Sequence, residues 1–64
     1  MRRHIGRRIN AQLADGSTIA GTLARVTRRE VELDQGAFVL GERRTPIDGA
    51  VVIPRGSLLW MQVV

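Results

Sequence analysis

The chain of 64 residues contains no cysteine and no lysine, one histidine, and only two aromatic side chains, Phe38 and Trp60. Domains below about 70–80 residues usually need disulfides, a structural metal ion or partner subunits to supplement a small core. Without cysteine and with a single histidine, disulfides and a structural metal are excluded for practical purposes. We therefore expect no metal and no other cofactor, and self-association remains as the source of added stability.

Long hydrophobic runs are also missing. The longest purely apolar runs, such as residues 50–53 and 58–61, are far shorter than the roughly 18 apolar residues that a membrane-spanning helix needs. The first eight residues include four arginines, and this positive charge is typical of a secretory leader, but no apolar stretch follows them. The sequence therefore predicts no membrane segment and a cytoplasmic location.

The positive charge is carried by arginine alone. Ten arginines against six carboxylates give a formal net charge of +4, which favours anionic partners such as nucleic acid. Guanidinium groups bind phosphate through two hydrogen bonds and stack on bases. An arginine-only composition is equally typical of a GC-rich genome, so both explanations stay open.

The first half of the chain has the pattern of a β-hairpin. Apolar residues alternate with polar ones between Arg8 and Leu13, as in a strand buried on one side. Asp15 and Gly16 follow, and Asp-Gly is a strong hairpin signal. Because glycine inside a strand marks a bend or a close backbone approach, we expect one or the other at Gly21 in the second strand.

Three further strands are expected. Alternation from Glu30, continuing to Leu40, predicts a third strand, and residues 50–53 and 58–64 predict a fourth and a fifth. The polar, glycine-rich stretch 41–49 is predicted to be a loop. A helix over residues 22–35 is the alternative, but its apolar stripe is poorer than the strand faces.

The two halves of this pattern resemble the Sm-like (LSm) signature. Residues 13–23 have the first half, an apolar residue followed by Asp15-Gly16 and, after four residues, by Gly21-x-Leu23. Residues 51–59 are similar to the second half, an apolar strand that leads into Arg55-Gly56 and another apolar strand. The resemblance implies an all-β fold, a small, strongly bent, five-stranded antiparallel barrel with little or no helix. We expect a basic N-terminal arm at residues 1–8 and one barrel domain at residues 9–64.

The resemblance also implies a ring of six or seven copies. In the family, the fourth strand of one subunit pairs with the fifth strand of the next. Such pairing would cover apolar edge strands that would otherwise promote aggregation. The interface residues implied for this chain are Val51, Val52, Ile53, Leu59, Trp60 and Met61.

RNA, or single-stranded DNA, is the partner implied by the resemblance. Family members hold RNA with the loop between strands two and three and with the Arg-Gly loop between strands four and five. Carried over, these loops are residues 27–30 and 55–57, and the expected nucleic-acid-binding residues are Arg28, Arg29, Arg55 and Gly56. The first loop lacks the asparagine and the aromatic residue that the family typically places there. The spacing from Gly21 to Leu33 is similar to that of the bacterial Hfq branch, but the Tyr-Lys-His signature of that branch is absent.

Other functions fit the residues less well. His4, Ser17 and Ser57 are the only candidates for nucleophilic chemistry, and His4 lies in the N-terminal arm, so we expect no enzyme activity. The predicted third strand has a row of carboxylates. An exposed strand face opposite arginines of the neighbouring strand, such as Arg25, explains this row better than a magnesium site does. A ring with a structural or assembly role, for example in a phage particle, is the alternative function. An SH3-like barrel that binds a protein ligand would need more aromatic residues.

Overall fold

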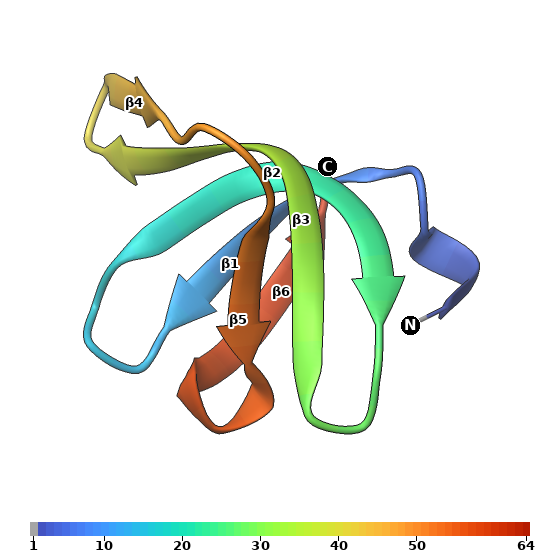
Figure 1. Ribbon diagram of the computed structural model, residues 1–64. Coiled ribbons are helices and arrows are strands. Elements are labelled where there is room, and N and C mark those ends of the chain that lie inside the picture. The colour runs from blue at the N-terminus through green and yellow to red at the C-terminus, as the bar shows by residue number, and fades with distance from the viewer. Residues whose placement is uncertain (1) are drawn as a thin grey trace.

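Strands make up most of the computed structural model, which describes residues 2–64 and, for Arg2, the backbone alone (Figure 1). The elements, in chain order, are the 3-10 helix η1 (Arg2–His4), the strands β1 (Arg8–Leu13), β2 (Thr18–Val26), β3 (Glu30–Leu40), β4 (Arg43–Pro46) and β5 (Val51–Pro54), the 3-10 helix η2 (Arg55–Ser57), and the strand β6 (Leu58–Val63). None of the helices in the described residues is long and apolar enough to cross a membrane.

All the strand pairs are antiparallel. The sheet has the order β4-β3-β2-β1-β6, and β5 pairs with the first half of β3. The long strands β2 and β3 curve strongly (Figure 1), with register shifts at Ala20/Thr22 and at Leu23/Arg25. This architecture confirms the prediction of a small, strongly bent, antiparallel all-β fold, and strands rather than a helix occupy residues 22–26 and 30–35.

Two glycines allow the strands to bend and pack closely. At Gly21, a β-carbon would lie 3.1 Å from Leu33 Cβ and 3.2 Å from the carbonyl oxygen of Asp34. At Gly36, it would lie 2.8 Å from Val51 Cγ2, closer than carbon atoms approach without displacement. The expected close backbone approach at Gly21 is confirmed, and Gly36 is a second, tighter site on β3.

The core consists of one cluster of aliphatic side chains. Each core side chain is at most 4% exposed, and most alternate along their strands, as expected for one buried face. The cluster contains Ile9, Ala11, Ile19, Leu23, Val31, Leu33 and Ile53. Among the described residues no polar or charged side chain is buried, so the side chains of the interior contribute to stability through aliphatic packing.

The stretch 41–49 corrects the sequence analysis, which predicted a loop. Instead, β3 continues to Leu40, the chain turns at Gly41 and Glu42, and β4 returns antiparallel, with Leu40 opposite Arg43. Gly41 has a φ of 60°, a conformation that suits glycine at a tight turn. The sequence pattern did not predict β4, because all four of its residues are exposed and it therefore has no apolar alternation. Between residues 2 and 64 the sheet therefore has six strands instead of the five predicted.

The N-terminal segment is attached to the sheet by its backbone. The N–H of Gly6 donates to the carbonyl of Leu23 at 2.7 Å, and the N–H of Leu23 donates to the carbonyl of Arg7 at 3.0 Å. Of the expected arm, Met1 lies outside the described residues, and Arg8 is already the first residue of β1. The Arg8 guanidinium donates to Thr22 Oγ1 at 3.2 Å and to the carbonyl of Gln35 at 3.4 Å, so this arginine connects three strands.

The predicted hairpin turn is confirmed at Asp15 and Gly16. The N–H of Leu13 donates to the carbonyl of Ser17 at 2.8 Å, and Gly16 has a φ of 93°. The hydroxyl of Ser17 and its backbone N–H, at 2.9 Å, both donate to Asp15 Oδ1. These two hydrogen bonds lower the pKa of Asp15 below its ordinary value, the hydroxyl bond having the larger effect.

The close packing of Gly36 against Val51 leads to a first prediction. Gly36→Ala should destabilise the fold by about 1–3 kcal/mol, the usual cost of overpacking. In the double variant Gly36→Ala/Val51→Ala, the methyl group of Val51 that would clash is gone. The double variant should therefore be more stable than the sum of the two single effects predicts, as measured by urea unfolding. Strict additivity would show that the two positions do not interfere.

A second prediction concerns the acid stability of the turn. Because the pKa of Asp15 is lowered by folding, its ionised form contributes stability above the unfolded pKa of about 3.9, and that contribution is lost as pH falls through the lower folded pKa. Asp15→Asn keeps an acceptor oxygen but cannot titrate. The difference in unfolding free energy between wild type and Asp15→Asn should therefore shrink as pH falls below about 4. A difference that does not change with pH would contradict this assignment.

Candidate nucleic-acid interface

Two arginine-bearing loops lie together at one end of the molecule. Residues 27–30 connect β2 to β3, and η2 connects β5 to β6, near the lower end of Figure 1. They are adjacent because β5 pairs with the start of β3, where Glu30 is opposite Pro54. The backbone N–H of Arg55 donates to the carbonyl of Arg29 at 2.8 Å. The structure thus brings together the loops that the sequence resemblance paired, although they are far apart in the chain.

The arginine side chains of both loops are available to a ligand. Arg28, Arg29, Arg55 and Gly56 are all exposed. The first loop surrounds an open hollow of about 510 Å³, which is lined by Thr27, Arg28, Arg29 and Glu30. Three guanidinium groups and one carboxylate give this end of the molecule a net positive formal charge.

Thr27 organises the first loop. Its backbone N–H donates to the carbonyl of Glu30 at 2.9 Å, and its hydroxyl donates to the same carbonyl at 3.2 Å. The hydroxyl also accepts from the N–H of Arg29 at 3.3 Å and from the N–H of Glu30 at 3.1 Å. Thr27 was not among the binding residues predicted from the sequence, although threonine at the start of a turn commonly bonds to nearby backbone groups.

The remaining arginines lie elsewhere. Arg25 is opposite Glu32 in the β2–β3 register, as expected for a carboxylate row that faces arginines. Arg43 and Arg44 lie on β4, at the opposite end of β3 from the loops. Within residues 2–64, no three His, Asp or Glu side chains are placed together to hold a metal ion.

Within the described residues, the edges of β5 and β6 stay unpaired, as does the outer edge of the short polar strand β4. β5 pairs only with β3, and β6 pairs only with β1. Of the predicted interface residues, Val52, Leu59 and Trp60 are 48%, 63% and 52% exposed. Val51 and Met61 are half-buried against the core, and Ile53 is a core residue at 2% exposure. Any contribution of Ile53 to an interface therefore comes from its backbone.

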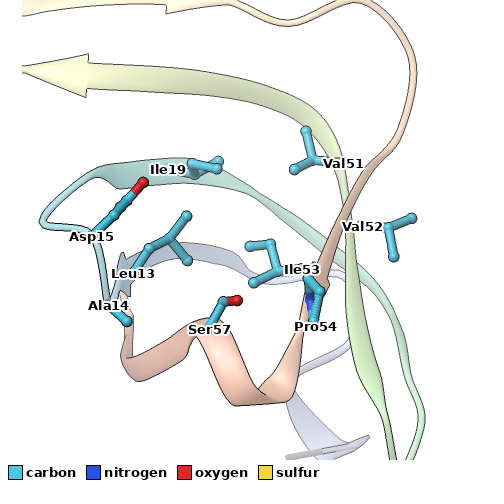
Figure 2. A pocket seen from close by; sticks show the side chains of 9 residues that line it. All are labelled: Leu13, Ala14, Asp15, Ile19, Val51, Val52, Ile53, Pro54 and Ser57. Atoms are coloured by element: carbon cyan, nitrogen blue, oxygen red, sulfur yellow. The ribbon is translucent and has the colours of Figure 1, made fainter.

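A groove runs beside the free edge of β5 (Figure 2). It has a volume of about 320 Å³ and lies between β5 and the β1–β2 turn. Leu13, Ile19, Val51 and Ile53 line its inner side, whereas the side chain of Val52 points away from it. The N–H of Ala14 donates to the carbonyl of Ser57 at 2.8 Å and ties the turn to η2. A strand added to β5 would thus meet an apolar groove.

Comparison with solved structures identifies the architecture as the Sm fold. A heptameric archaeal Sm protein superposes with a TM-score of 0.89 at 19% identity, over 98% of this chain and 93% of the other. The heptameric SmAP1 of P. aerophilum gives a TM-score of 0.90 at 19% identity, over 98% of this chain and 85% of the other. A chain of the NatC complex bound to CoA superposes with a TM-score of 0.86 at 22% identity, over 98% of this chain and 82% of the other. No family model matches the sequence, and no curated protein matches it.

Proposed function

We propose that this protein forms a ring and binds RNA, or single-stranded nucleic acid, through Arg28, Arg29 and Arg55. The main support is the hydrogen bond from the Arg55 N–H to the Arg29 carbonyl, because it places all three arginines at one end of a small body. Gly56 has open space where a β-carbon would be, so a ligand can approach the backbone there. No catalytic step is part of this function.

The proposed ring uses the free edges of β5 and β6. The unpaired edge of β5 in one copy is proposed to pair with the unpaired edge of β6 in the next, which satisfies the backbone groups of both strands. The exposed Leu59 and Trp60 would then be covered by the neighbouring copy. Similar structures are heptamers, and a closed ring of six or seven copies is expected here.

The arginine loops supply the affinity for nucleic acid in this proposal. Each copy in a ring adds three exposed guanidinium groups at one opening, and guanidinium groups bind phosphates as bidentate donors. Neutralising phosphates releases counterions, so binding should be strong at low salt and weaken steeply as salt rises. The net charge of +4 per chain supports attraction at longer range.

A structural role is the second candidate. A chain of the NatC complex has a similar fold, so this fold also occurs in a component of a complex. In this alternative, the free edges and the apolar groove bind neighbouring subunits, and the arginines serve only for solubility. The two candidates share ring or complex formation and differ in whether the loops bind nucleic acid.

The ring is tested by native mass spectrometry at micromolar concentration. Wild type should give one closed oligomer, and Leu59→Glu and Trp60→Glu should give monomers, because a charge cannot be buried in the interface without a partner. Leu40→Glu is the matched control, since Leu40 is 77% exposed on the β3–β4 hairpin. Trp60 is the only tryptophan, so its emission should shift to the blue on assembly. A wild-type monomer would refute the ring.

The loop site is tested by a charge-matched pair of triple variants. Arg28→Ala/Arg29→Ala/Arg55→Ala should weaken binding of single-stranded RNA by at least about tenfold at low salt and flatten the dependence of affinity on salt. The control, Arg25→Ala/Arg43→Ala/Arg44→Ala, removes the same charge at exposed positions outside the loops. Equal losses in both variants would indicate attraction by net charge alone, and unchanged binding in the loop variant would favour the structural role.

A further inference from the structure

The Thr27 hydroxyl has no hydrogen-bonding capacity left for a ligand. A hydroxyl has one donor and two acceptor positions. The donor of Thr27 is used by the Glu30 carbonyl, and both acceptor positions are used by the N–H groups of Arg29 and Glu30. This side chain therefore holds the loop and does not read the edge of a base.

The other side chains of the two loops include no amide and no aromatic group. Arg28, Arg29, Glu30 and Arg55 are exposed, and Gly56 has no side chain. Ser57 lines the apolar groove beside β5 instead of the hollow at the first loop. Guanidinium groups bind phosphate and stack on any base face, and neither interaction depends strongly on base identity.

We infer that the loop site holds single-stranded nucleic acid by its phosphates and by stacking, with little regard to base sequence, and that Thr27 is its positioning residue. The inference rests on the proposed function and adds the class of ligand: single-stranded RNA and DNA of any composition. Thr27 acts through the loop backbone, because its bonds to the N–H groups of Arg29 and Glu30 fix the turn that carries Arg28 and Arg29. The bond from Arg55 to the Arg29 carbonyl then fixes the turn against the second loop.

Binding to homopolymers tests the ligand class. Fluorescent oligonucleotides of about ten nucleotides, a length within the usual site sizes for single strands, are titrated with the wild-type protein. Poly-U, poly-A and poly-C RNA and poly-dA DNA should bind with affinities that agree within about threefold. A preference of about tenfold or more for one base, or for RNA over DNA, would overturn the inference while leaving the proposed function intact. Failure of every oligonucleotide to bind would refute the proposed function itself.

Two variants test the positioning role. Thr27→Val keeps the shape and removes the hydroxyl, and Thr27→Ser keeps the hydroxyl. Thr27→Val should weaken the binding of all four oligonucleotides by a common factor of about three to ten, because three hydrogen bonds that hold the loop are lost. The salt dependence should stay unchanged, since the same arginines remain. Thr27→Ser should bind within about twofold of wild type.

Two different outcomes would contradict the positioning role of Thr27. If Thr27→Val changes the order of preference among the four oligonucleotides, Thr27 contacts a base and is not a positioning residue. If Thr27→Val binds like wild type, or Thr27→Ser is as weak as Thr27→Val, the hydroxyl does not position the arginines. Oligomeric state and thermal unfolding of both variants are measured in parallel, so that weaker binding is assigned to the loop only where the assembly is intact.

Discussion

The change of direction of β3 at Gln35 and Gly36 is the constraint on which the rest of the structure depends. Before this point β3 pairs with β5, and after it β3 pairs with β4. Gln35 adopts a φ of 52°, which is uncommon for a residue with a side chain. Gly36 leaves the space that Val51 fills. Without this bend, β5 would not reach the start of β3, and the Arg55 loop would not lie beside the Arg29 loop.

The same bend explains why the edges of β5 and β6 stay open. β5 covers only the first half of β3, and the Arg55–Ser57 turn then directs β6 to the far side of β1. The single chain is thus left with free edges on β5 and β6, and an apolar groove lies beside the edge of β5. An exposed edge with apolar side chains such as Leu59 and Trp60 is prone to uncontrolled association, and the proposed pairing with a second copy would remove that hazard.

Local signals in the sequence were sufficient for the first hairpin and for the close approach at Gly21, because both depend on residues within one turn or one strand. The β3–β4 hairpin was missed since its returning strand is exposed on both faces and has no apolar alternation. The proximity of Arg29 and Arg55 depends on pairing between distant strands, so it came from the family resemblance rather than from periodicity. The roles of Thr27 and Gly36 became visible only in the structure, because each depends on particular neighbouring atoms.

In the proposed ring, assembly and ligand binding would be linked through charge. Bringing copies together at the proposed edges also brings their guanidinium groups together, and like charges at one opening oppose association. A polyanion that binds several copies at once removes this repulsion and stabilises the assembled form in preference to single chains. A core of seven aliphatic side chains leaves little stability in reserve in so small a domain. In the proposed ring, bound phosphates would therefore offset the energetic cost of gathering the arginines, and the apolar edges would supply the attraction that holds the copies in register.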